Sequence, residues 1–163
     1  LVNTVSLGGN LLMNVGPMPD GTMPPDHVAR LREAGDWLKA HGEAVYGTRG
    51  GPFRNDETGG MTCRGNTIYV HVWDWPAHRV CLPEINARIL SVYSPTARDL
   101  HHEMVDGRLC FSVGEQDRLS LDTLVVLTLD RPAEAVRNND LPWRLQQTGK
   151  GHAALIVEDF LGQ

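Results

Sequence analysis

The side chains that could carry chemistry in this chain are its histidines, its cysteines and two polar residues beside an apolar run. The chain holds seven histidines, and His101, His102 and Glu103 are consecutive, a composition found in metal sites. Neighbouring residues of a strand point to opposite faces, so these two imidazoles cannot readily chelate one ion. We therefore place the three residues in a solvated turn, and we predict neither a metal site nor a cofactor.

The three cysteines, Cys63, Cys81 and Cys110, are widely separated and include no Cys-x-x-Cys pair. An odd number of cysteines without motif spacing is typical of small buried side chains. It does not favour metal ligands or a disulfide framework. We therefore predict three buried thiols, and these do not indicate in which redox compartment the protein resides.

Two polar residues in the stretch GGNLLMNVGPMPDGTMPP, residues 8–25, are candidates for a binding site. Asn14 lies near the end of an apolar run, where its amide can line a pocket or satisfy backbone groups of the following loop. Asp20 precedes Gly21, and it can contact a ligand or hold a turn by accepting backbone N–H groups. The stretch has no G-x-G-x-x-G pattern and no P-loop lysine, and its prolines remove N–H donors. It therefore excludes a phosphate or nucleotide site.

Periodicity predicts the elements that position these residues. Residues 10–16 are continuously apolar, which predicts a strand covered on both faces, as in a parallel sheet. Residues 25–41 have the period of an amphipathic helix, with Thr22 as candidate N-cap and Gly42 as candidate C-cap. Strand, loop and helix together form half of a β/α repeat.

The pattern changes after residue 51, where glycine and proline interrupt the chain. In NTIYVHVWDW the apolar Ile68, Val70 and Val72 alternate with larger side chains. Four more short runs follow between turn residues: RVCLP, ARILSVYSP, GRLCFSV and TLVVLTLD. Several short strands at regular spacing favour an antiparallel sandwich, so the chain is α+β overall.

Composition limits the classes of function. The 163 residues suffice for one ordinary domain or two smaller units, with 41% hydrophobic residues and a net charge of -5. The charge gives no reason to expect nucleic acid as a partner, and no apolar run approaches the roughly 20 residues that insert across a membrane. The first residues have helical spacing and no signal-peptide pattern, so we expect a downstream piece of a longer protein.

Several blocks in a fixed order resemble the α-L-fucosidases, family 29 of the glycoside hydrolases. The blocks are GGNLLMNVGP, PDGTMPP, GDWLKAHGEAVYGTR and RGNTIYVHVWDWP. The resemblance implies that residues 1–47 are the last β/α unit of an eight-fold β/α barrel. It implies that residues 52–130 are the antiparallel β-sandwich that follows, and it leaves residues 131–163 as an unassigned tail.

The resemblance also implies a function. The family removes terminal α-L-fucose from glycans with retention of configuration, by a carboxylate nucleophile and a second acid/base group about 5 Å apart. Neither group matches a residue of this chain, so the resemblance implies no catalytic residue here and an inactive isolated chain. It makes Asn14 and Asp20 candidates to line the substrate pocket. The implied partners are fucosylated glycans and the missing barrel portion, in a secreted, periplasmic or lysosomal parent.

An alternative is a non-catalytic carbohydrate-binding or structural sandwich module. Trp73 and Trp75 lie on one predicted strand, and aromatic faces can stack on sugar rings. We favour burial of both, and of His71, in the core or against the neighbouring domain. Glycan binding by the isolated chain, lost on replacement of either tryptophan, would distinguish the alternative.

Overall fold

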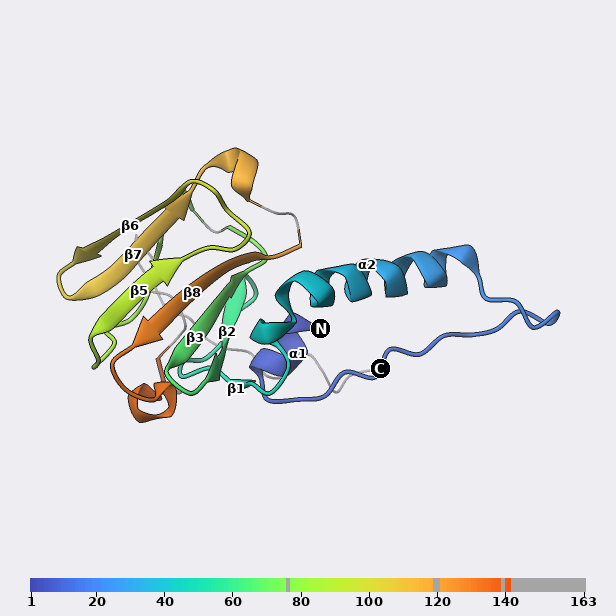
Figure 1. Ribbon diagram of the computed structural model, residues 1–163, viewed down its shortest axis with the longest axis horizontal. Coiled ribbons are helices and arrows are strands. Elements are labelled where there is room, and N and C mark those ends of the chain that lie inside the picture. Colours follow the sequence, from blue (N-terminus) through green and yellow to red (C-terminus); the bar gives the residue numbers. More distant parts are fainter. Residues whose placement is uncertain (76, 119–120, 139, 142–163) are drawn as a thin grey trace.

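Two antiparallel sheets pack face to face in the computed structural model, which describes residues 1–75, 77–118, 121–138 and 140–141 (Figure 1). The larger sheet has the strand order β1-β2-β3-β8-β5, and the smaller sheet has the order β4-β7-β6. Each pairing of neighbouring strands in these two sheets is antiparallel. The predicted antiparallel sandwich is confirmed.

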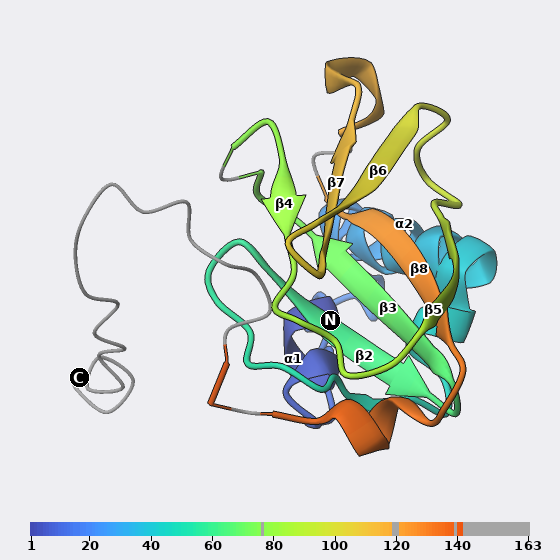
Figure 2. The same ribbon diagram turned by 90° about the vertical axis from the view of Figure 1, so that its left-hand side faces the viewer.

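The elements follow one another with short connections after the first helices. The helices are α1 (Val2–Ser6), α2 (Pro25–His41) and the short 3-10 helices η1 (Gly42–Ala44), η2 (Glu115–Asp117) and η3 (Ala133–Val136). The strands are β1 (Arg49–Gly50), β2 (Gly59–Arg64), β3 (Thr67–Val72), β4 (Val80–Cys81), β5 (Ile89–Tyr93), β6 (Leu100–Val105), β7 (Arg108–Val113) and β8 (Thr123–Leu129). Figure 2 is viewed from the side of β6 and β7, with α2 behind the larger sheet.

Alternate residues of the strands form the core between the two sheets. Ile68, Val70 and Val72 of β3 share one face, as predicted, and all three are fully buried. Val70 is paired in register with Val125 of β8, and Phe111 of β7 meets this face from the smaller sheet. Burial of these side chains is the main stabilising contribution to the sandwich.

The second face of the larger sheet is also covered. Tyr69 of β3 packs with Leu124 and Val126 of β8 against Ala44, which belongs to η1 directly after α2. The hydroxyl of Thr62 donates a hydrogen bond to the carbonyl of Ala44 at 2.6 Å. The end of α2 is therefore fixed to the sheet, and strands β2, β3 and β8 are buried on both faces, whereas β5 is largely exposed.

Helix α2 runs from Pro25 to His41 as predicted, and Gly42 follows as its C-cap. The N-cap is Pro24 and not the predicted Thr22, because the hydroxyl and N–H of Thr22 both bond to Asp20. A proline at the first helical position suits the helix, since it lacks an N–H that would be unpaired there. The helix projects from the sandwich, and the residues before it form an extended arm (Figure 1).

The predicted strand over residues 10–16 is not formed, so that prediction is wrong for this chain. The segment pairs with no strand among the described residues. Leu12 is 89% exposed, and Leu11 and Met13 are exposed as well. An apolar strand of a parallel sheet needs a neighbour on each side and helices on its faces. The described part of the chain offers the segment no such neighbour.

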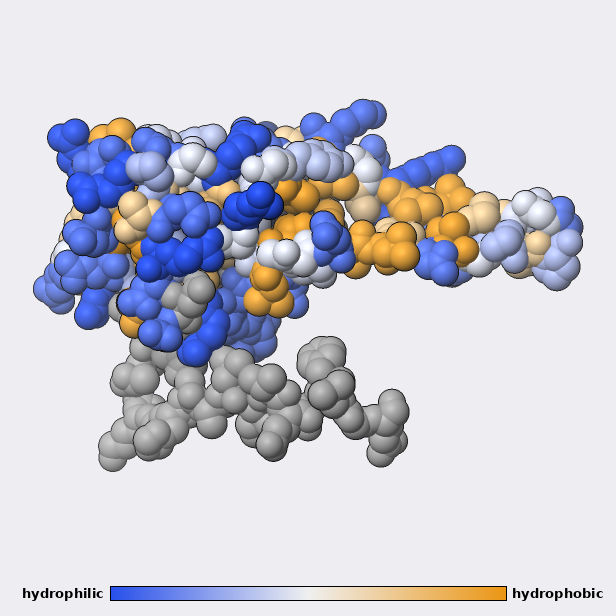
Figure 3. All heavy atoms as spheres, turned by 90° about the horizontal axis from the view of Figure 1, so that it is seen from below, coloured by the Kyte–Doolittle hydropathy of each residue, from blue (hydrophilic) through white to orange (hydrophobic). Residues whose placement is uncertain are grey.

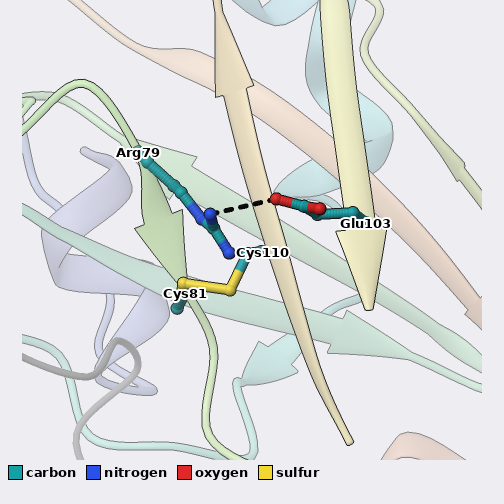
Figure 4. Close-up of a disulfide and its surroundings, with 4 residues drawn as sticks. All are labelled: Arg79, Cys81, Glu103 and Cys110. Atoms are coloured by element: carbon teal, nitrogen blue, oxygen red, sulfur yellow. Dashed lines mark ion pairs between the residues drawn. A yellow bond between two sulfur atoms is a disulfide. The ribbon is translucent and has the colours of Figure 1, made fainter. Parts of the chain in front are cut away.

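The prediction of three thiols is wrong for two of them, because Cys81 of β4 and Cys110 of β7 form a disulfide (Figure 4). The two residues are directly opposite in the β4–β7 register, with Cα atoms 4.0 Å apart. Arg79 and Glu103 form an ion pair at 3.0 Å beside the bond. Cys63 is free and buried, as predicted.

Two further segments differ from the sequence prediction. Residues 101–103 are exposed, as predicted, but they lie on strand β6 and not in a turn. Ala133 and Val136 of η3 are buried in the core, so the sandwich extends into the segment 131–163. The part of that segment from 142 to 163 lies outside the described residues.

Gly51 lies where the chain passes closest to β2. A Cβ atom added at Gly51 would overlap with the Cβ of buried Met61, and the N–H of Gly51 is bonded to the carbonyl of Met61 at 2.8 Å. We expect Gly51→Ala to lower the free energy of unfolding in urea by about 2 kcal/mol, because neither backbone can move aside. Gly16→Ala, with nothing within 4 Å of the added atom, is the control. Equal losses in both variants would contradict this prediction.

Burial raises the pKa of the Cys63 thiol above its ordinary value of 9.0, and the nearby carboxylate of Glu134 raises it further. The unfolded thiol therefore ionises first as the pH rises, and the native state binds more protons in that range. We expect the free energy of unfolding to fall as the pH rises above about 9. Urea unfolding on either side of that pH should show a smaller fall for Cys63→Ala. An identical pH dependence in both proteins would refute the expectation.

Candidate functional site

The two predicted site residues lie on the exposed arm before α2. The Oδ1 atom of Asn14 accepts a hydrogen bond from the N–H of Val15 at 3.0 Å. The Oδ1 atom of Asp20 accepts bonds from the N–H and the hydroxyl of Thr22, at 3.0 and 2.7 Å, and these bonds lower the pKa of Asp20. The amide oxygen of Asn14 and the carboxylate oxygen of Asp20 thus each accept a hydrogen bond from a nearby backbone N–H. This is the local structural role that the sequence offered as one of two alternatives for each residue. Contact of either side chain with a substrate stays a prediction.

The turn around Asp20 is built as its sequence predicts. Gly21 has a φ of +83°, which a residue with a Cβ rarely adopts, and its N–H bonds to the carbonyl of Met18 at 2.9 Å. The carbonyl of Thr22 accepts from the N–H of Met18 at 2.8 Å. The Pro-Asp-Gly sequence therefore closes a tight turn at the tip of the arm.

A cavity of about 530 Å³ lies between α2 and the sandwich. Trp37 contributes to its lining from α2, Trp73 from the residues directly after β3, and Asp122 from the residue before β8. Met13 of the arm also lines it. Asn14 and Asp20 are not among its lining residues. The structure thus brings together residues that sequence reasoning kept apart.

A buried polar pair stands at the wall of this cavity. His71 is fully buried on β3, and its Nδ1 lies 2.8 Å from Oδ2 of Asp122. Its Nε2 lies 3.3 Å from the hydroxyl of Thr62, and its ring packs near Trp37, with ring centroids 6.4 Å apart. The interpretation of His71 as a satisfied buried residue is confirmed. Because Trp37 belongs to α2, the pair also joins the helix to the sheet.

Two buried polar atoms of residues that line this cavity have no partner among the described residues. Among the residues that the structure describes, neither Nε1 of Trp37 nor Oδ1 of Asp122 makes a hydrogen bond. Buried polar groups are nearly always paired in folded proteins, so these two atoms are exceptions to the general pattern.

The two strand tryptophans have different environments. Trp75 packs edge-on against Phe111 with ring centroids 6.2 Å apart, and its Nε1 donates to the hydroxyl of Thr123 at 3.2 Å. The guanidinium of Arg118 lies 5.1 Å from its ring centroid. Trp75 is therefore packed against the core, as favoured from sequence. Trp73 is half-buried at the cavity between sandwich and helix, and its Nε1 donates to the carbonyl of Glu57 at 2.8 Å.

Sequence reasoning missed Trp37 and Asp122 as cavity residues. Trp37 has helical spacing that predicts packing, and Asp122 lies just before a strand, where an acidic residue is unremarkable in sequence. Among the cavity residues, Trp73 is the one that the sequence pattern places away from the core, because it lies on the face of the predicted strand opposite to Val70 and Val72. The cavity depends on how α2 docks on the sheet, which no local pattern gives.

The described residues contain no group of three or more His, Cys, Asp or Glu side chains that could hold a metal ion. Within the same ranges, no helix has the length and apolar character needed to cross a membrane.

The chain is similar to known proteins over parts of its length. Residues 1–43 match the family model described as Alpha-L-fucosidase. The α-L-fucosidase of Branchiostoma floridae is 46% identical over 79 residues, which cover 47% of this chain and 18% of that protein. Tissue α-L-fucosidase of Homo sapiens is 40% identical over 85 residues, which cover 49% of this chain and 18% of that protein. The chain thus spans about a fifth of the length of the curated relatives that it matches.

Solved structures extend the likeness into the sandwich. α-L-Fucosidase isoenzyme 1 from Paenibacillus thiaminolyticus has a TM-score of 0.69 and 27% identity, over 79% of this chain and 32% of that chain. The Thermotoga maritima α-fucosidase solved with a mechanism-based inhibitor has a TM-score of 0.57 and 28% identity, over 78% of this chain and 32% of that chain. Both the sequence and the fold of the chain are thus similar to α-L-fucosidases over part of their length.

Proposed function

We propose that this chain is part of a glycoside hydrolase that removes terminal α-L-fucose from glycans. One observation carries the proposal: residues 1–43 match the α-L-fucosidase family model, and 79% of the chain has a fold similar to part of a solved α-L-fucosidase. Fucosylated glycans are then the substrates of the complete protein.

In this proposal residues 1–47 are the last β/α unit of an eight-fold β/α barrel, and residues 52–130 are the sandwich that follows it. The exposed side chains of Leu11, Leu12 and Met13 support the assignment, because a barrel strand buries such side chains between its neighbours. Figure 3 shows apolar surface along the part that projects from the sandwich. The rest of the barrel is the partner that would cover this surface.

The proposed reaction is hydrolysis with retention of configuration. The relative from Bacteroides thetaiotaomicron was solved as a trapped covalent intermediate, which supports a two-step path through a glycosyl-enzyme. Such a path requires two carboxyl groups on either side of the glycosidic bond. In this proposal both belong to the rest of the barrel, so the chain is inactive by itself.

Asn14 and Asp20 have a defined place in the proposed barrel. The turn that holds Asp20 would follow the last strand at the face where barrel enzymes keep their active sites. We place both residues at the rim of the fucose pocket, where they would shape the loop more than react with the sugar. Their hydrogen bonds to Val15 and Thr22 are consistent with a role in shaping the loop.

The Cys81–Cys110 disulfide supports an oxidising location for the parent protein, either outside the cell or in a periplasmic or lysosomal space. Disulfides persist in such compartments and are rare in the reducing cytosol.

A chimera tests the proposed function. Residues 1–141 of this chain would replace the matching segment of the Paenibacillus thiaminolyticus isoenzyme, and hydrolysis of 4-nitrophenyl α-L-fucopyranoside would be measured. We expect activity in the chimera and none in the chain alone, since the catalytic carboxylates come from the remainder. A chimera that folds, as judged by circular dichroism, but does not hydrolyse the substrate would overturn the proposal. Hydrolysis by the chain alone would overturn the proposal that the chain is inactive by itself.

A further inference from the structure

We propose that the free edge of strand β6 pairs with the same edge of a second copy of this chain, so that the two smaller sheets join across a two-fold axis. Strand β6 (Leu100–Val105) is the last strand of its sheet and is paired with β7. It lies at the end of the molecule opposite to α2 and the arm, which the rest of the barrel would cover (Figure 1). The proposal does not rest on the proposed function.

The first argument is a comparison of the sheet edges among the described residues. Strands β1 and β4 have two residues each, which is too short to receive a neighbouring strand. The register of β5 is irregular between Ile89 and Ser91, and such a bulge disrupts further pairing. Strand β6 has six residues in unbroken register with β7, and it contains no proline or lysine. It is therefore the edge best able to accept another strand.

The second argument is the direction of the backbone groups of β6. Asp106 and Gly107 have φ values of +50° and +77°, as in the two-residue turns that join neighbouring strands, so Val105 and Arg108 on either side of them exchange hydrogen bonds. Because this direction alternates along a strand, every second residue turns its N–H and C=O groups away from β7. These residues are Met104, His102 and Leu100. No strand in the described ranges lies on that side, so their backbone groups are available to a partner.

The third argument is that the sequence of this edge complements itself. Opposed residues of an antiparallel pair share a face of the sheet. A two-fold axis through His102 therefore sets Leu100 opposite Met104 of the second copy, and His101 opposite Glu103 of the second copy. The first pair is apolar, and Met104 is 59% exposed in the single chain. The second pair joins an imidazole to a carboxylate. An axis through Glu103 would instead oppose two carboxylates, so the side chains favour a second copy in one register.

The ion pairs that His101 and Glu103 already make can be kept in this arrangement. Asp99 lies 2.8 Å from Nε2 of His101, and Arg79 lies 3.0 Å from Glu103. All four side chains are partly or largely exposed. An imidazolium can donate through both of its nitrogens, so His101 could bond to its own Asp99 and to Glu103 of the second copy. Donors and acceptors would then alternate across the axis.

Cross-linking of the full chain tests the two-fold axis directly. In the proposed register His102 opposes itself in a hydrogen-bonded pair, whose Cα atoms are about 5.5 Å apart, a distance that suits a disulfide. His102→Cys, oxidised with copper phenanthroline, should therefore give a covalent dimer in non-reducing electrophoresis. Met104→Cys is the matched control on the same strand. Its two cysteines would be offset by about 14 Å along the strands, so it should not cross-link.

Sedimentation equilibrium measures the association without a cross-link. We expect the wild-type chain to form a reversible dimer. Met104→Lys should raise the dissociation constant of this dimer about ten-fold, because each dimer would place two lysines beside Leu100 side chains. Leu90→Lys is the control, since Leu90 is 53% exposed on the bulged edge strand β5. It should associate as the wild type does.

Three results would overturn the proposal, provided that circular dichroism shows each variant to be folded. The first is a wild-type chain that stays monomeric up to millimolar concentration. The second is unchanged association of Met104→Lys, which would place the contact elsewhere, for example on the exposed arm. The third is cross-linking of Met104→Cys as readily as of His102→Cys, because the axis would then not pass through His102.

Discussion

Replacing Asp122 with alanine should lower the free energy of unfolding by about 3 kcal/mol. His71 is fully buried, and the carboxylate of Asp122 is the partner of its Nδ1 at 2.8 Å. Without the carboxylate, the imidazole keeps only its contact with Thr62 and stays away from water. Urea unfolding followed by tryptophan fluorescence measures the loss.

A second aspartate–histidine pair, on the surface, serves as a control that distinguishes the effect of burial from the effect of the pairing itself. Asp99 and His101 also lie 2.8 Å apart, but their side chains are 52% and 75% exposed. Asp99→Ala should therefore cost only about 0.5 kcal/mol, since water replaces the lost partner. If Asp99→Ala and Asp122→Ala cost the same, the burial argument is wrong.

Loss of the Cys81–Cys110 disulfide should cost about 3 kcal/mol, because the bond closes a loop between residues separated by 29 positions. Strand β4 has only two residues, and the core residues Val80 and Leu82 lie on either side of Cys81. The bond therefore fastens a short strand that supplies buried side chains. The measurement is the urea unfolding of the double variant Cys81→Ala, Cys110→Ala against the wild type.

A reductant gives an independent check on the disulfide. Dithiothreitol should lower the unfolding midpoint of the wild type toward that of the double variant, and it should leave the double variant unchanged. Hydrogen exchange should show faster opening of the amide of Leu82, which bonds to the carbonyl of Leu109 at 2.9 Å. A wild-type midpoint that does not respond to the reductant would exclude a stabilising role for the bond.

Local patterns predicted those parts of the fold that depend on local forces. The helix over residues 25–41 follows from its period and its flanking prolines and glycine, and Ile68, Val70 and Val72 share the predicted core face of β3. Strand β2 was missed, because its six residues, GGMTCR, begin with two glycines and do not alternate. Its place beside β3 comes from register with that strand and not from its own preference.

The failures at the candidate site have a common physical origin in tertiary contacts. Residues 10–16 have the composition of a buried strand, but an apolar run becomes one only beside other strands. The bond between Cys81 and Cys110 depends on β4 lying next to β7, which spacing along the chain does not specify. Trp37 and Asp122 come to one cavity only because the end of α2 docks on the sheet.

Coverage of strands β2, β3 and β8 on both faces has a consequence for how this sandwich can be inherited. The face that holds Tyr69 and His71 is covered by chain that precedes the sandwich, through Ala44 and Trp37. A gene fusion that transferred only the strands would carry an uncovered face with a buried histidine–carboxylate pair into its new host. Recombination should therefore retain sandwich and preceding helix together, and a transplantable unit would begin before α2 and not at β1.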